Sequence, residues 1–160
     1  MPRTLKTITL TLAVSLGASA VANAQTIRLS ATLSGASETP ALLTGAAGSA
    51  EVFVNLSTQV VTYRVDVFNM PTVTTAGHFH VGGPGLAGPV VVDLTPPPVT
   101  DDFSLQGTAT ASALRPRADQ GIRTWQDFIQ ALVGGQIYVN IHSTTNAGGE
   151  IRGQLIPDRQ

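Results

Sequence analysis

The chain contains no cysteine among its 160 residues. This absence excludes disulfides, a thiol nucleophile and a thiolate metal site. It also excludes the kind of lipid anchor that is attached to a cysteine directly after an export signal. The fold must therefore be stabilised by packing, and any metal site must be built from other ligands.

Charge is scarce as well, since Asp, Glu, Lys and Arg make up 12% of the residues. Two of the nine basic residues, Arg3 and Lys6, precede the apolar run 8–21, and small residues follow at 22–24. This order is typical of a signal peptide with its cleavage site, and the run is too short to span a bilayer. We therefore expect a signal peptide over residues 1–24. The product would be an exported, soluble protein, periplasmic or extracellular, with no membrane insertion after cleavage.

The remaining chain, residues 25–160, has no basic region. Seven basic residues remain beside ten acidic ones once the signal is removed, which gives a net charge of −3. Nucleic acids and anionic membranes bind basic patches, so we exclude both as partners. Because no linker or charge block divides this segment, we expect a single domain.

Apolar and polar residues alternate with period two along most of this domain. The pattern predicts half-buried strands with one face on a core. Clusters of glycine, proline and asparagine separate the strands at short intervals. About eight short strands of this kind predict an all-β fold, an antiparallel sandwich or barrel. The expected strands are 27–33, 50–56, 61–67, 75–81, 90–94, 108–114, 136–142 and 150–156.

One segment breaks the strand pattern and predicts a short helix. Thr124 is a suitable N-cap with Asp127 three residues later, and Gly134-Gly135 ends the segment. We expect this helix to cover one end of the sheets, with its tryptophan as a core residue rather than a ligand platform. The apolar residues at helical spacing are Trp125, Phe128, Ile129 and Leu132.

Three blocks of the sequence resemble the signature blocks of the CHRD domain, a module named after chordin. They are LSGASETPA (33–41), GHFHVGGPGLAGPVVVDL (77–94) and GGQIYVNIHSTTNAGGEIRGQL (134–155), in the family's order. The resemblance implies that residues 25–160 form one CHRD domain with an immunoglobulin-like β-sandwich fold. In chordin, repeated copies belong to an extracellular antagonist of growth factors, whereas single-domain members are exported proteins with no settled activity. We do not carry growth-factor binding over to this chain.

All three histidines of the chain fall within two of these blocks. In an extended strand His78 and His80 project to one face, while Phe79 projects to the other. The same parity places His142 beside Asn140 on the polar face of its own strand. If the two strands are neighbours, the three imidazoles converge on one polar face.

Three neutral imidazoles are a suitable ligand set for Cu(II) or Zn(II), with a carboxylate, a water or a substrate as the fourth ligand. Their nitrogens would lie within about 4 Å of one another, given Zn–N bonds of about 2.0–2.1 Å. Glu150, Asn140 and Arg152 are candidates for a supporting role or a fourth ligand. No Asp-rich loop offers the oxygen cage that Ca²⁺ prefers.

A structural interpretation of the same residues stays open. Histidine is common on the wet faces of strands, and Asn140 and His142 could simply hydrogen-bond the turn 144–149. The glycines of 82–88 are interpreted as the bend after the histidine strand, since no Lys-Ser/Thr follows to complete a phosphate loop. Asp101-Asp102 is interpreted as a solvated turn.

Three functions remain after these exclusions. The first is an exported binding protein that holds copper or zinc through the three histidines. The second is an extracellular or cell-envelope module that binds a protein partner or matrix without metal. The third is a metal-dependent hydrolase or redox enzyme, which we rank last because no complete catalytic set is evident.

Overall fold

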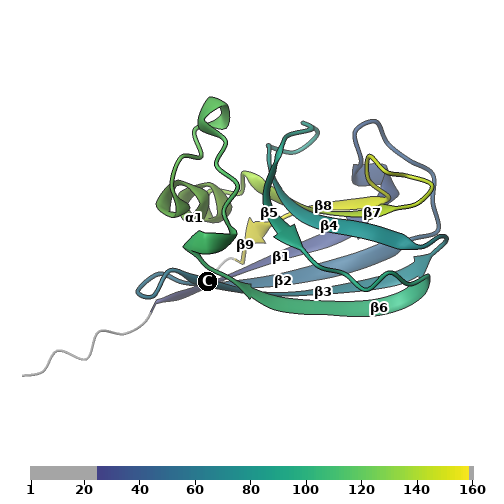
Figure 1. Ribbon diagram of the computed structural model, residues 1–160, viewed down its shortest axis with the longest axis horizontal. Helices are drawn as coiled ribbons and strands as arrows, with labels where there is room; N and C mark the ends of the chain where they lie inside the picture. The colour runs from purple at the N-terminus through teal and green to yellow at the C-terminus, as the bar shows by residue number, and fades with distance from the viewer. Residues whose placement is uncertain (1–24, 159–160) are drawn as a thin grey trace, which may run out of the picture.

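The computed structural model describes residues 25–158, and the expected signal peptide lies outside the described residues. Nine strands form one antiparallel sheet, and a short α-helix precedes β7 (Figure 1). The prediction of an all-β antiparallel fold with one short helix is confirmed. The strands are β1 (Thr26–Ser34), β2 (Ala47–Asn55), β3 (Val60–Met70), β4 (Thr74–Val81), β5 (Val90–Leu94), β6 (Asp101–Ala109), β7 (Ile137–Ser143), β8 (Ile151–Gln154) and β9 (Ile156–Pro157).

The sheet folds back on itself around one core. Its strand order is β5-β4-β7-β8-β1-β2-β3-β6, with β9 paired to β1. Figure 1 shows β4, β5, β7 and β8 above β1, β2, β3 and β6. Across the interior, the edge of the Tyr63 ring contacts the fully buried Phe79, with ring centroids 5.6 Å apart. Burial of such a side chain stabilises the fold by about 1.5–3 kcal/mol.

The alternating sequences set the register of the strands. Leu29 of β1 lies opposite Val52 of β2, and Ala31 lies opposite Ala50. All four side chains are buried in the core. Since a slip by one residue would turn them to solvent, the apolar pattern fixes the pairing.

The predicted strand 108–114 is wrong in its bounds. β6 begins at Asp101 and ends at Ala109, paired antiparallel with β3. The acidic pair that was expected in a solvated turn therefore starts a strand, and the Asp102 carboxylate accepts a 2.8 Å hydrogen bond from the backbone N–H of Asn69. β3 is longer than expected, and its pairing with 101–109 sets the bounds of β6. The weak apolar alternation of this segment did not predict those bounds.

The helix forms where its local signals predict it. Helix α1 (Trp125–Val133) begins with a capping box in which Thr124 and Asp127 bond each other's backbone N–H, and it ends at Gly134. Its four predicted apolar residues are buried, and it covers one end of the folded sheet (Figure 1). In the part of the chain that the structure describes, no helix is long and apolar enough to cross a membrane.

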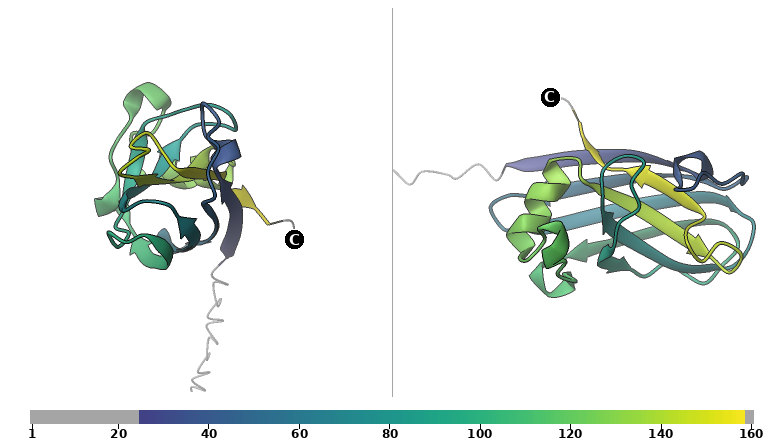
Figure 2. Two further views of the ribbon diagram at one scale, coloured as in Figure 1. Left: turned by 90° about the vertical axis from the view of Figure 1, so that its right-hand side faces the viewer. Right: turned by 90° about the horizontal axis from the view of Figure 1, so that it is seen from above.

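The outer side of β4, β7 and β8 carries polar side chains that are shielded from solvent. Three loops, residues 35–46, 82–89 and 144–149, hydrogen-bond to this side; their positions can be followed in Figures 1 and 2. His142 is 7% exposed and Arg152 is 3% exposed. We call the group the polar layer; it consists of His78, His80, Tyr138, Asn140, His142, Glu150, Arg152 and Gln154.

Candidate metal centre

The pairing of β4 with β7 brings the three histidines together. His78 lies opposite Asn140, and His142 lies opposite Ala76 in the same ladder. Because side chains alternate along each strand, His78, His80 and His142 all project from the outer side, away from the buried Phe79. The three histidines therefore lie on one face of the sheet, as the alternation of side chains predicted.

The ring of His80 is held by the loop that follows its strand. Its Nδ1 lies 2.8 Å from the carbonyl oxygen of Gly88. A carbonyl only accepts, so Nδ1 carries the hydrogen and Nε2 keeps a free lone pair. Within residues 25–158, this buried Nε2 has no hydrogen-bond partner. The ring also stacks on Tyr138, with centroids 4.9 Å apart and planes within 10°.

His142 is held in the same way by the turn between β7 and β8. Its Nδ1 lies 2.9 Å from the carbonyl oxygen of Ala147, which fixes the hydrogen on Nδ1 and the lone pair on Nε2. The structural role that the sequence suggested for this residue is thus present. It leaves the metal-binding role open, because the two roles use different ring nitrogens.

His78 completes the group from the more exposed side. Its Nδ1 lies 2.9 Å from Nε2 of His142, so in the metal-free protein it donates a hydrogen to that lone pair. Its Nε2 lies 3.5 Å from the Asp93 carboxylate, which in turn pairs with Arg115 at 2.5 Å. A carboxylate beside the outer nitrogen of a histidine is the usual support of a metal ligand.

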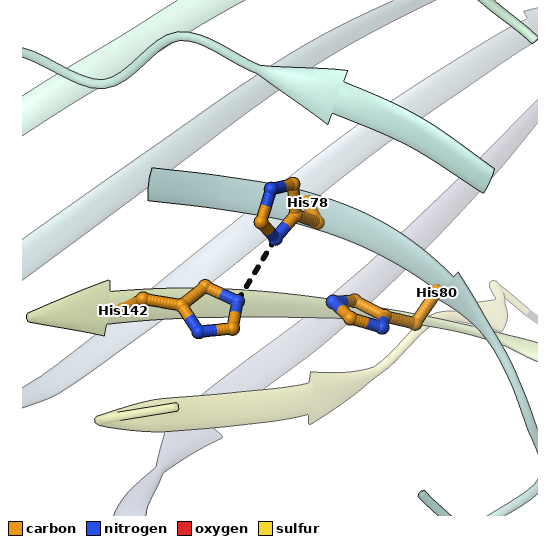
Figure 3. A group of neighbouring side chains, drawn as sticks. All are labelled: His78, His80 and His142. Atoms are coloured by element: carbon orange, nitrogen blue, oxygen red, sulfur yellow. Dashed lines mark hydrogen bonds between the residues drawn. The ribbon is translucent and has the colours of Figure 1, made fainter. Parts of the chain in front are cut away.

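One nitrogen from each histidine faces a common space (Figure 3). These ligand atoms lie within 4.8 Å of one another. Tetrahedral bonds of about 2.0–2.1 Å to Zn would place them about 3.4 Å apart. Around an ion, the 2.9 Å pair of His78 Nδ1 and His142 Nε2 would open, and the pairs that are farther apart would close. The limit of 4.8 Å is larger than the sequence-based expectation of about 4 Å.

Burial keeps all three imidazoles in the neutral form that binds metal. It lowers the pKa of His80 to about 4, with a smaller contribution from the neighbouring histidines. Burial, followed by His142, lowers the pKa of His78, and burial lowers the pKa of His142. No proton needs to be removed from a charged ring before an ion binds at neutral pH.

Comparison with known proteins places the chain in a family. The family model of the CHRD domain matches residues 29–155. The chain belongs to the CHRD domain family. No curated protein and no solved structure matches it.

The other predicted site residues of this CHRD domain lie beside the histidines but are engaged elsewhere. The fully buried Glu150 accepts hydrogen bonds from Thr44, from Ser143 at 2.8 Å and from Asn146 at 2.6 Å. Burial acts to raise its pKa, but these bonds outweigh burial and lower it. Glu150 is not among the described groups that share a ligand space with the histidines.

Asn140 and Arg152 face the loops 35–46 and 82–89 rather than an ion. Asn140 Nδ2 donates to Glu38 across 3.5 Å. The guanidinium of Arg152 lies 3.5 Å from the Tyr138 ring centroid and donates to the carbonyl of Gly83 at 3.0 Å. Both residues tie the loops to the sheet, so their positions indicate no direct bond to a metal.

Sequence reasoning missed the groups that orient the three rings. Two of them are backbone carbonyls, those of Gly88 and Ala147, and no residue type predicts such a contact. The loop with Gly88 was interpreted as a bend only, whereas it holds His80. Asp93 could have been found, since it lies opposite His78 in the β4–β5 hairpin.

Proposed function

We propose that this CHRD domain is an exported protein that binds a transition metal, copper or zinc. The ligands are Nδ1 of His78, Nε2 of His80 and Nε2 of His142. One observation carries the proposal: two of the rings use Nδ1 on a carbonyl oxygen, and each presents its other nitrogen to the same space. Imidazole ligands suit both Cu(II) and Zn(II), and a three-histidine set leaves a fourth position for water or a small ligand.

The buried and unpartnered Nε2 of His80 supports this assignment. A buried polar atom without a partner costs about 1–3 kcal/mol, and a bound ion would remove that cost. The contact of His78 with His142 supports it as well, because an ion would replace the hydrogen between the two nitrogens. The proton on His78 would then lie on Nε2, toward Asp93.

We also propose that the protein works outside the cytoplasm, as a binding or storage protein of the periplasm or the extracellular space. The N-terminal sequence and the family support this location. An immunoglobulin-like sandwich remains our proposal for the finer fold. It is supported by the contact between Tyr63 on β3 and Phe79 on β4 across the interior.

Metal analysis tests the function. Purified untagged protein is loaded with Cu(II) or Zn(II), desalted and measured by inductively coupled plasma mass spectrometry, beside the variant His78→Ala/His80→Ala/His142→Ala. We expect about one ion per chain in the wild type and a negligible amount in the variant. Equal and negligible metal in both would contradict the proposal, provided that circular dichroism shows both proteins folded.

A metal-free interaction module is the second candidate. Two leucines at the loops over the polar layer favour it, since Leu43 is 101% exposed and Leu86 is 64% exposed. Exposed apolar side chains mark protein contacts where they gather into one patch. Under this function, partner capture persists in the triple histidine variant and is lost in Leu43→Ser/Leu86→Ser. Loss of capture in the histidine variant alone would contradict it.

A further inference from the structure

The segment 110–117 borders the candidate metal centre from the outer edge of β5. It follows β6 and precedes α1, and it belongs to none of the three sequence blocks that resemble the family signature. β5 is an end strand of the sheet, and one of its edges pairs with β4, the strand of His78 and His80. The segment lies along the other edge. It is therefore separated from the proposed ligands by a single strand.

Three contacts fix this segment to β5. Leu114 forms an antiparallel bridge to the strand. The backbone N–H of Arg115 donates to the carbonyl of Val91 at 2.8 Å, and Nε of Arg117 donates to the carbonyl of Val90 at 2.8 Å. The backbone of Arg115 is therefore held in place, and its side chain projects from a fixed point.

The side chain of Arg115 forms an ion pair with Asp93. Its guanidinium lies 2.5 Å from one carboxylate oxygen of Asp93, and the other carboxylate oxygen lies 3.5 Å from Nε2 of His78. Asp93 lies opposite His78 in the ladder of β4 with β5, so the register of the two strands places the carboxylate. Arg115, Asp93 and His78 thus form a row from the outer edge of β5 to a proposed metal ligand.

The separation of Asp93 from His78 agrees with the tautomer of the metal-free protein. Nδ1 of His78 donates its hydrogen to Nε2 of His142, so Nε2 of His78 carries a lone pair. A lone pair and a carboxylate oxygen form no hydrogen bond, and the two atoms stay 3.5 Å apart. When an ion takes Nδ1, the hydrogen lies on Nε2 and faces Asp93. The contact then becomes a charge-assisted hydrogen bond.

Asp93 needs a second partner while the site holds no ion. Its side chain is 45% exposed, and the lone pair of His78 does not attract the carboxylate. Without Arg115 the carboxylate would turn to water, and binding of an ion would have to order this side chain as well. The cost of ordering one side chain corresponds to about 3-fold to 10-fold in affinity.

From these contacts we infer that Arg115 is a positioning residue of the proposed metal site and that it acts on His78 through Asp93. Arg115 holds the carboxylate in place before an ion arrives. The hydrogen bond that His78 then donates to Asp93 transmits the occupancy of the site to the segment 110–117. This inference rests on the proposed function, in which Nδ1 of His78 is a ligand.

A double-mutant cycle tests the inference, with the Zn(II) affinity measured by competition with a chromophoric chelator. Arg115→Ala should weaken zinc binding about 3-fold to 10-fold in the wild-type background. In the Asp93→Ala background the same change should cause no loss, because the carboxylate that Arg115 holds is absent. A direct effect of charge has the opposite sign, since removal of a positive charge favours a bound dication. Unchanged or tighter binding in Arg115→Ala would overturn the inference, and so would an equal loss in both backgrounds.

Hydrogen exchange at saturating zinc gives a second readout. Zinc should slow the exchange of the Arg115 backbone N–H in the wild type but not in Asp93→Ala, which a structural role alone would not produce. Arg123→Ala removes an exposed arginine from the following loop and should match the wild type in zinc affinity. Circular dichroism checks the folding of each variant. Equal exchange with and without zinc would overturn the inference, whereas a wild type that binds no zinc would contradict the proposed function and the inference together.

Discussion

The two outer sides of the folded sheet have similar sequences and different environments. Along β1, β2 and β3, polar residues alternate with core residues and stay open to solvent, as in the exposed pair of Arg28 with Glu51. Along β4, β7 and β8 the same alternation produces the polar layer, where His80 and Glu150 are buried under loops. The alternation along a strand thus determines which side chains point away from the core. The loops determine which of those side chains are shielded from solvent.

This difference determines what each side can do. An exposed ion pair is hydrated and screened, and its side chains keep alternative partners in water. A covered imidazole has a fixed tautomer and few water contacts, so its free nitrogen is available for an ion. The loops convert an ordinary polar strand face into a candidate binding site. Variants that change one residue on the covered side and one on the open side test this distinction.

The largest expected effect is on Glu150. Its replacement by alanine leaves the donors of Thr44, Ser143 and Asn146 without an acceptor, and we expect the free energy of unfolding to fall by about 3 kcal/mol. Urea denaturation measures this change. The matched variant Glu51→Ala on the open side should change stability only slightly. Equal losses in the two variants would contradict the distinction between the covered and the open side.

A smaller effect is expected at Asp93, which lies beside His78. Asp93→Ala should leave the fold intact, because the side chain lies at the surface and is 45% exposed, and should weaken Zn(II) binding about 10-fold to 100-fold. Competition with a chromophoric chelator measures the affinity. Asp66→Ala provides the control on the open side. An unchanged affinity in Asp93→Ala would show that this carboxylate does not support the site.

The smallest effect concerns pH and contrasts two carboxylates of the covered side. The pKa of Glu38 is raised to about 7, so its protonated form is favoured by folding. Stability from this group is complete below the ordinary glutamate pKa and is lost as pH rises through about 7. The pKa of Glu150 is lowered, so its contribution is lost only in acid. We expect Glu38→Gln to remove about 1 kcal/mol of the fall in stability between pH 5 and 8, allowing for partial exposure.

Thermal unfolding at a series of pH values checks this prediction. Glu51→Gln is again the control, and its stability should follow the wild type between pH 5 and 8. A Glu38→Gln profile that is parallel to the wild type would contradict the raised pKa of Glu38.

The sequence predicted the features that depend on local spacing. Thr124 with Asp127 predicted the start of α1, since a capping box is formed within one turn. The shared face of His78 and His80 followed from the geometry of an extended strand. The family blocks then predicted the CHRD family, which the family match bears out over residues 29–155.

Features that depend on distant partners were not predictable in this way. The bounds of β6 are set by its pairing with β3 rather than by its own pattern. The cover of the polar layer comes from loops whose residues carry no apolar or polar period. The carbonyls of Gly88 and Ala147 orient two imidazoles, and a backbone oxygen has no signature in residue type.

The ring nitrogens of the three histidines provide the most direct test of the metal site. We would record long-range ¹H–¹⁵N spectra of the imidazoles before and after one equivalent of Zn(II). We predict that zinc shifts Nδ1 of His78 and Nε2 of His80 and His142, while Nδ1 of His80 and His142 stays protonated on its carbonyl. Unchanged nitrogen shifts, or ligation through Nδ1 of His80 or His142, would contradict the account.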